Sequence, residues 1–215
     1  MIVCGVEEAG RGPVIGPMVM AGVIIDEKDE HKLVDLGVKD SKLLSPARRR
    51  AMYPEILKLV KAYKIIILSP REIDECLASE DINLNWLEAL TSVKIIDSLK
   101  PDKAILDCPS NNVQAYKEYV LTRLEKPIEI ISEHKADLKY PVVSAASILA
   151  KVTRDAEIEK IQEKIGQDIG SGYPADPKTK AFLQANYDKY DIFRKSWASY
   201  KRLIEGKKQS NLGDF

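Results

Sequence analysis

Four acidic residues stand where predicted strands end or predicted helices begin. Glu7 and Glu8 follow an apolar run at Met1–Val6, Asp107 ends a short predicted strand, and Asp137 comes just before a long predicted helix. Acids at such positions can converge on one edge of a sheet, and carboxylate oxygens are the ligands that Mg²⁺ prefers. Two such ions about 3.5–4 Å apart can clamp a phosphodiester, one activating water and the other stabilising the leaving oxygen.

The same acids have an alternative interpretation as surface charges. Most Asp and Glu side chains are solvated, and Asp107 alone fits that description. The adjacent pair of Glu7 and Glu8 fits it less well, because neighbouring like charges repel without a counter-ion. The group as a whole therefore indicates a site for a hard cation.

Glycines surround one arginine directly after the acidic pair, in Gly10-Arg11-Gly12 and again at Gly16. The segment is not a P-loop, because no Gly-Lys-Ser/Thr follows, and its spacing does not match a dinucleotide fingerprint. Glycines let a backbone approach a sugar–phosphate closely, while the guanidinium supplies charge. On spacing alone, a tight turn without a ligand is an equal alternative.

Strand patterns occupy the first two-thirds of the chain and helical patterns the last third. Ser45 and Ser69 each precede a proline, which is typical of a capped helix start. This order predicts one α/β domain over residues 1–205, with a mixed five-stranded sheet flanked by helices, and a flexible tail over residues 206–215. The predicted strands are Met1–Val6, Met18–Ile25, Tyr63–Leu68, Lys103–Asp107 and Ile128–Ile131, and the last predicted helices are Val142–Gly166, Thr179–Tyr187 and Ser196–Leu203.

The composition fits a folded protein of the cytoplasm. The chain has 215 residues, 45% of them hydrophobic, which is enough apolar material for a core. Basic and acidic residues number 33 each, so an electrostatic role needs a local patch. We expect neither a transmembrane helix nor a signal peptide, because there is no long apolar run and no basic leader. The three cysteines are widely spaced, which indicates reduced thiols.

The sequence around the acids resembles the ribonuclease HII family, the type 2 ribonucleases H. Gly5-Val-Glu-Glu-Ala-Gly-Arg-Gly-Pro13 is similar to the family signature Gly-x-Asp-Glu-Ala-Gly-Arg-Gly, except that position 7 is Glu where the signature has Asp. The short form is similar to archaeal members. Four further segments match in order, namely Lys39–Lys42 with Leu44-Ser45, Leu106-Asp107, His134–Asp155 and Ser171–Pro177.

The resemblance implies a ribonuclease H-like α/β fold with a helical C-terminal region. It also implies an endoribonuclease that hydrolyses the RNA strand of RNA–DNA hybrids and cuts 5′ of ribonucleotides embedded in duplex DNA. Two-metal-ion catalysis with Mg²⁺ or Mn²⁺ would leave 3′-hydroxyl and 5′-phosphate ends. The family's catalytic and metal-binding acids correspond here to Glu7, Glu8, Asp107 and Asp137.

Substrate contacts are implied by the same resemblance. Gly10, Arg11 and Gly12 match the loop that reads a 2′-hydroxyl, the group that distinguishes RNA from DNA. Tyr173 matches a tyrosine that stacks on the adjoining sugar, although a turn aromatic is the alternative. The family's phosphate contacts correspond to Lys42, Ser147 and Lys151, and the two lysines would otherwise be solvated charges.

The C-terminal segment contains two further candidate interaction sites. A basic stripe suits a duplex backbone, with a solvated helix face as the alternative. The last seven residues resemble a sliding-clamp-binding peptide without its second aromatic, with Gln209, Leu212 and Phe215 at the motif positions, although a frayed tail would also fit. The stripe consists of Arg194, Lys195, Lys201, Arg202, Lys207 and Lys208.

Two other functions remain open at this stage. Glu7 could impair the metal site and leave a catalytically impaired RNA–DNA junction-binding protein, which a divalent-ion titration with a hybrid duplex would reveal. Another nuclease of the same fold, such as a junction resolvase, would cut an all-DNA junction. We expect the protein to be a monomer.

Overall fold

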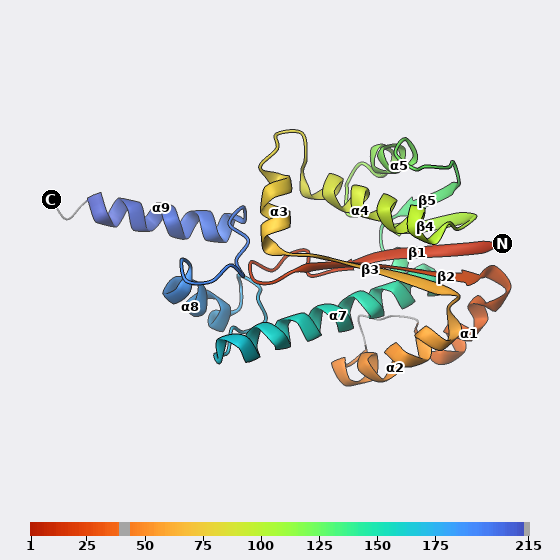
Figure 1. The fold of residues 1–215 in the computed structure, drawn as a ribbon, viewed down its shortest axis with the longest axis horizontal. Helices are drawn as coiled ribbons and strands as arrows, with labels where there is room; N and C mark the ends of the chain where they lie inside the picture. The colour runs from red at the N-terminus through yellow and green to blue at the C-terminus, as the bar shows by residue number, and fades with distance from the viewer. Residues whose placement is uncertain (39–43, 213–215) are drawn as a thin grey trace.

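A five-stranded sheet runs through the centre of the molecule (Figure 1). The computed structural model describes residues 1–38 and 44–212, with side chains as far as Lys207. The strand order is β3-β2-β1-β4-β5, antiparallel across β3-β2-β1 and parallel across β1-β4-β5. The predicted mixed sheet is thus confirmed. Its strands are β1 (Ile2–Ala9), β2 (Met18–Asp26), β3 (Ala62–Leu68), β4 (Lys103–Asp107) and β5 (Glu129–Glu133).

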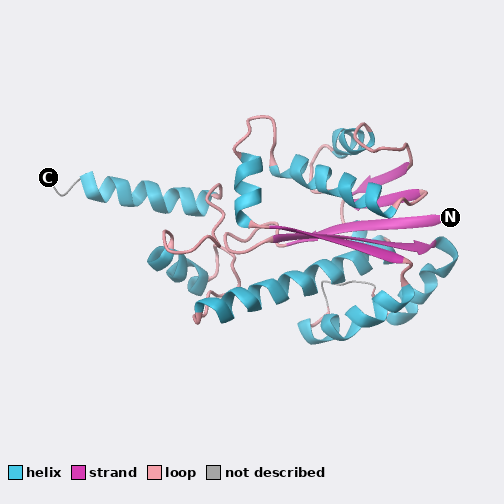
Figure 2. Cartoon of the chain, in the orientation of Figure 1, coloured by secondary structure: helices cyan, strands magenta, loops and turns pink. Residues whose placement is uncertain are grey.

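Helices cover both faces of this sheet (Figure 2). One face packs on α7 (Pro141–Ile165), with α1 (Glu30–Leu36) and α2 (Pro46–Leu59) beside it. The other face packs on α4 (Leu84–Leu99) and α5 (Val113–Leu121). The remaining elements are η1 (Glu27–Asp29), α3 (Pro70–Leu77), α6 (Ala136–Lys139), α8 (Pro177–Asn186) and α9 (Ala198–Leu212).

β1 is longer than the sequence predicts, because its pairing with β2 continues through Glu7 and Glu8 to Ala9. β2 is apolar and buried along nearly its whole length, so it provides a ladder as long as β1 itself. Successive side chains of a strand point to opposite faces. Glu7 therefore projects toward the α7 side of the sheet, and Glu8 toward the α4 side.

Gly5 allows α7 to lie directly against β1. A Cβ atom at Gly5 would be 2.4 Å from the carbonyl carbon of Val142, at the start of α7. Only glycine permits such close backbone approach. The contact places α7 along β1, so that Lys151, further along the helix, reaches the end of the strand that carries Glu7.

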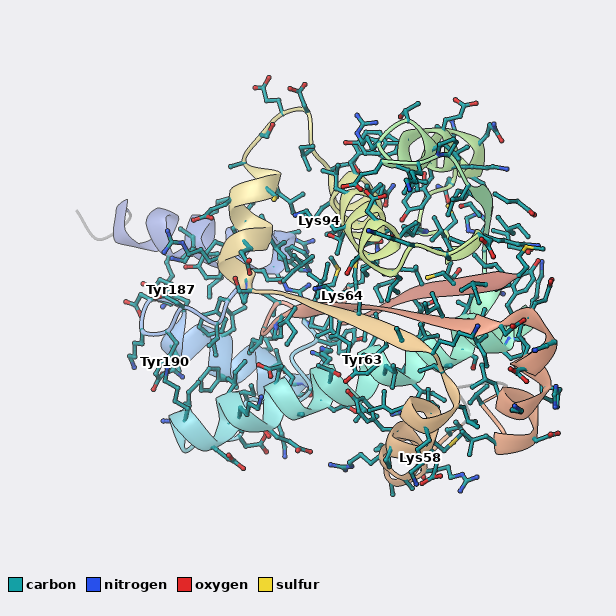
Figure 3. The ribbon with its side chains drawn as sticks, turned by 45° about the vertical axis from the view of Figure 1, so that its right-hand side comes forward. Lys58, Tyr63, Lys64, Lys94, Tyr187 and Tyr190 are labelled. Atoms are coloured by element: carbon teal, nitrogen blue, oxygen red, sulfur yellow. The ribbon has the colours of Figure 1, made fainter. Side chains whose placement is uncertain are left out.

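The C-terminal region differs from its prediction in one respect. α9 continues to Leu212 and passes through Gly206, where the sequence predicts a flexible tail to begin. A single glycine in a helix costs about 1 kcal/mol, which flanking helix-forming residues can offset. α8 and α9 pack on a separate apolar cluster, in which Tyr190 stacks on Phe182 with 6.0 Å between ring centroids. Tyr187 and Tyr190 lie beside α8 (Figure 3).

Local signals account for most of the helix starts. Ser45 caps α2 by accepting a hydrogen bond from the Arg48 amide, and Ser69 forms a capping box with Glu72 at the start of α3, as the sequence predicts. α1 was not predicted, because Leu33 is its only buried residue and gives no periodic pattern. Within the described residues, no helix is both long and apolar enough to span a bilayer.

Candidate active site

Three carboxylates meet at one edge of the sheet. Glu7 of β1, Asp107 at the end of β4 and Asp137 in α6 place one carboxylate oxygen each within 4.8 Å of the others. β1 and β4 are parallel neighbours paired as far as Val6 and Leu106, so the next residue of each strand is an acid. The amide of Ala136 donates to Asp107 Oδ1 at 3.4 Å, which ties α6 to the end of β4.

Burial makes this cluster costly when every carboxylate is charged. Glu7 is 6% exposed and Asp137 1% exposed. Burial raises the pKa of Glu7 well above its ordinary value, and the nearby charges of Glu8 and Asp107 raise it further. Glu7 Oε2 is buried and accepts no hydrogen bond from the described residues. An orphaned carboxylate oxygen among other hard oxygen donors fits a divalent cation such as Mg²⁺ or Mn²⁺.

Glu8 lies apart from that cluster, on the other side of β1, although it lines the same pocket. Burial raises the pKa of Glu8, the charge of Asp107 raises it further, and the Arg11 guanidinium opposes both. Glu8 therefore lies between the carboxylate cluster and the glycine-rich loop.

The pocket beside the acids has a volume of about 440 Å³ and also contains basic groups. Lys151 reaches it from α7 and donates a hydrogen bond to Ser147 Oγ. Ser147 is fully buried and does not line the pocket, so it contacts Lys151 rather than an exposed phosphate position. Arg49, Arg154 and Asp155 line the pocket as well, and no sequence motif marks them as site residues.

The glycine-rich loop follows β1 directly, and the Arg11 side chain fixes it to α4. Arg11 forms an ion pair with Glu88 of α4, and its Nη2 donates to Asn85 Oδ1 at 2.8 Å. Glu88 is 1% exposed, and burial raises its pKa well above the ordinary value, with the charge of Glu8 as the second cause. The Arg11 guanidinium is therefore directed at α4. Glu88 interrupts the apolar run from Trp86 to Leu90 in α4, which is the sequence signal that could have identified it.

Tyr173 lies over this loop and is 45% exposed. Its Cε1 is 3.3 Å from the position a Cβ atom would take at Gly12, and the Arg154 guanidinium carbon is 5.8 Å from its ring centroid. The amide of Val14 donates to the Gly172 carbonyl at 2.8 Å, so the two loops are joined. The structure thus brings Tyr173 to the same pocket as the acids.

Arg194 is not part of a solvent-facing stripe, because it is 0% exposed. The chain turns into α9 beneath the glycine-rich loop, which encloses this side chain, whereas Lys195, Lys201 and Arg202 are exposed. Of the other predicted contacts, Lys42 and Phe215 lie outside the described residues. Gln209 and Leu212 belong to α9, and their side chains lie outside the description.

Comparison with known proteins identifies the family. Residues 4–200 match the sequence model described as ribonuclease HII. The chain belongs to the ribonuclease HII family. It is 46% identical to the ribonuclease HII of Methanocella arvoryzae, over 99% of this chain and 96% of that protein. This family membership confirms the predicted resemblance and makes the chain a ribonuclease H, an endonuclease of the hydrolase class that acts on RNA–DNA hybrids.

Solved ribonuclease HII structures share the fold. The ribonuclease H2 of Pyrococcus horikoshii superposes with a TM-score of 0.90 at 41% identity, over 97% of this chain and 100% of that one. The ribonuclease HII in a PCNA complex from Archaeoglobus fulgidus gives 0.84 at 39% identity, over 92% and 95% of the two chains. The ribonuclease H-like fold is thereby confirmed.

Glu7→Gln should stabilise this chain in the absence of metal at neutral and alkaline pH. The pKa of Glu7 is raised in the folded state, so protonated Glu7 contributes to the stability of the fold. This contribution is fully present below the ordinary pKa of about 4.3 and is lost as pH rises through the raised value. Glutamine removes that loss. Thermal unfolding in EDTA from pH 4 to 9 should show an advantage of the variant that grows with pH.

The matched control is Glu75→Gln, which changes an exposed glutamate on α3. Parallel pH profiles for Glu7→Gln and the parent chain would contradict the assigned burial cost.

Proposed function

We propose that this chain cuts 5′ of ribonucleotides embedded in duplex DNA, as well as within RNA–DNA hybrids, and leaves 3′-hydroxyl and 5′-phosphate ends. The observation that carries the proposal is the cluster of Glu7, Asp107 and Asp137, because Glu7 and Asp107 line the same pocket as the loop Gly10–Gly12. A ribose-reading loop next to a cation site would position the phosphate on the 5′ side of a ribonucleotide for hydrolysis.

The reaction adds water across one phosphodiester bond. A water oxygen bonds to phosphorus while the bond from phosphorus to the upstream 3′ oxygen breaks, and that oxygen gains a proton. Divalent cations, when bound, lower the pKa of water and stabilise the negative charge on the departing oxygen. Glu7, Asp107 and Asp137 would hold such ions, with Glu8 close by on the other side of β1.

The chain's other groups would orient the substrate. Lys151 places a positive charge in the pocket that holds the acids, where it attracts the phosphate. Arg154, which is 8% exposed and has a buried Nε without a hydrogen bond among the described residues, adds a second cation there. Tyr173 offers an exposed ring face for the neighbouring sugar.

Asp107→Asn and Asp137→Asn should each reduce turnover by about 100-fold or more and leave hybrid binding within about threefold. Either change removes a carboxylate charge from the cation site while keeping the shape of the side chain. The measurement is cleavage of a duplex with one embedded ribonucleotide at saturating Mg²⁺, beside equilibrium binding in EDTA. Asp97→Asn, which changes a half-buried aspartate of α4 that lines a different pocket, is a matched control. Parental turnover in either variant would remove that acid from the site, and no cleavage by the parent chain would contradict the proposed function.

Glu7→Asp should raise the Mg²⁺-supported rate by about one order of magnitude or more. Glutamate carries its carboxylate up to about 1.5 Å further than aspartate, one carbon–carbon bond length. Mg²⁺ demands near-octahedral geometry at about 2.0–2.1 Å and tolerates such a shift poorly. Mn²⁺ is larger, so the gain with Mn²⁺ should be smaller. An unchanged Mg²⁺ rate would mean that the site accommodates the longer side chain, and binding without cleavage in the parent alone would favour the impaired junction-binding protein.

Tyr173→Ala should slow cleavage at a single embedded ribonucleotide more than cleavage of a long hybrid. Stacking on an aromatic ring contributes about 1–3 kcal/mol, and a single ribonucleotide offers few other contacts that identify it. Initial rates on the two substrates measure the difference, with Tyr63→Ala, an exposed tyrosine on β3, as the control. Equal losses on both substrates would leave Tyr173 with a structural role.

A sliding clamp is the protein partner that we propose. The Archaeoglobus relative was solved with PCNA, and residues 209–215 of this chain resemble a sliding-clamp-binding peptide, with Gln209, Leu212 and Phe215 at the motif positions. Deleting residues 209–215 should abolish clamp binding in calorimetry without changing cleavage of short duplexes. Unchanged clamp affinity after the deletion would contradict this assignment.

A further inference from the structure

Arg194 is fully buried, although no ion pair among the described residues includes it. Its guanidinium instead donates to three backbone carbonyls. Nη2 donates to Gly10 O at 2.6 Å, Nη1 to Arg11 O at 3.0 Å and Nε to Gly16 O at 3.0 Å. Burial lowers the pKa of Arg194 to about 9, and the charge of Arg154 lowers it as the second cause, so the group remains a cation at neutral pH. Burying a charged guanidinium is unfavourable, and the three hydrogen bonds to the loop carbonyls offset this cost.

The residues around Arg194 bind the same loop. The Arg194 amide donates to Val14 O at 2.9 Å, and Trp197 Nε1 donates to Gly12 O at 3.0 Å. The Arg194 guanidinium carbon lies 4.7 Å from the Trp197 ring centroid, so the two side chains support one another. Five carbonyls of the loop, those of Gly10, Arg11, Gly12, Val14 and Gly16, thus accept hydrogen bonds from Arg194 and Trp197.

This anchor is itself fixed to the body of the protein. Asp74 of α3 accepts hydrogen bonds from the Lys195 amide at 2.8 Å and the Ser196 amide at 2.9 Å. The segment that carries Arg194 and Trp197 is therefore held by α3 on one side and holds the loop on the other. A contact between residues 184 positions apart connects the C-terminal region to the loop.

Peptide geometry gives the anchor a consequence for the pocket. In a trans peptide, the carbonyl of one residue and the amide of the next point in opposite directions. Because the Gly10 and Arg11 carbonyls point at buried Arg194, the amides of Arg11 and Gly12 point away from it. Neither amide donates a hydrogen bond to another of the described residues. Both residues line the pocket that Glu7 and Asp107 also line.

We propose that Arg194 is a positioning residue for ribonucleotide recognition: it holds the Gly10–Gly12 loop so that the Arg11 and Gly12 amides face the ribose 2′-hydroxyl. The inference rests on the proposed function, because it needs a ribonucleotide in the pocket. Trp197 assists by fixing the Gly12 carbonyl, and Glu88 by holding the Arg11 side chain from the opposite side. A lysine cannot replace Arg194, because one ammonium lacks the planar set of donors that three separate carbonyls require.

The test measures discrimination by the full-length chain in EDTA, where no cleavage occurs. Fluorescence anisotropy gives Kd for a DNA duplex with one ribonucleotide and for the same duplex in all-DNA form, and the ratio of the two reports 2′-hydroxyl recognition. Arg194→Lys should lower that ratio by about tenfold, the scale of one to two lost hydrogen bonds, while Kd for all-DNA stays within about threefold. Arg71→Lys, an exposed arginine on α3, is the control and should change neither value.

Trp197→Phe is the second variant, and it decides the question if Arg194→Lys fails to fold by circular dichroism. It removes the indole N–H and keeps an aromatic ring, so it should lower the ratio by about fivefold. A folded Arg194→Lys with the parental ratio, or with equal losses on both duplexes, would overturn the positioning role, as would an unchanged ratio in Trp197→Phe. A parental ratio near one would instead contradict the proposed function itself.

Discussion

Mutual repulsion between carboxylates is the constraint on which this sheet edge depends. Glu7, Asp107 and Asp137 bring oxygens within 4.8 Å of one another, and burial together with the charges of Glu8 and Asp107 raises the pKa of Glu7 well above its ordinary value. The parallel ladder of β1 and β4 fixes two of the acids, and α6 fixes the third, so the side chains cannot separate to relieve the repulsion. A divalent cation turns that cost into affinity, because charges interact more strongly where water is excluded. The same arrangement therefore lowers the stability of the metal-free fold and favours the binding of a cation in one geometry.

The position of the glycine-rich loop is set by β1, the strand that carries Glu7. β1 places Glu7 and Glu8 at its end and then enters the loop without a break, so a shift of the loop would also move the acids. α4 holds the Arg11 side chain from one side, and Arg194 holds the backbone carbonyls from the other. The C-terminal region is therefore part of the site. This agrees with the extent of the family match, which runs to residue 200 and includes both Arg194 and Trp197.

Local sequence signals predict the helices and strands better than they predict which of these elements contact one another. The five strands and the Ser45 and Ser69 caps followed from periodicity and local signals, and three of the four acids that were expected to converge do so in the structure. The extension of β1 past Val6 did not, because it depends on the length of β2, and it separates Glu8 from the cluster of three. The sequence predicts that Arg194 is part of a basic stripe, since a sequence shows its charge but not the loop that folds over it. Arg154 and Glu88 were missed for the same reason, because their roles depend on residues more than 70 positions away.

Anomalous diffraction from crystals grown with Mn²⁺ tests the central claim most directly. Manganese scatters anomalously, so its position is observed without reference to activity or to any variant. We predict a strong anomalous peak within coordination distance of Glu7, Asp107 and Asp137, beside the pocket that the Gly10–Gly12 loop borders. Density for a metal elsewhere on the chain, with none between these three carboxylates at saturating Mn²⁺, would contradict the account.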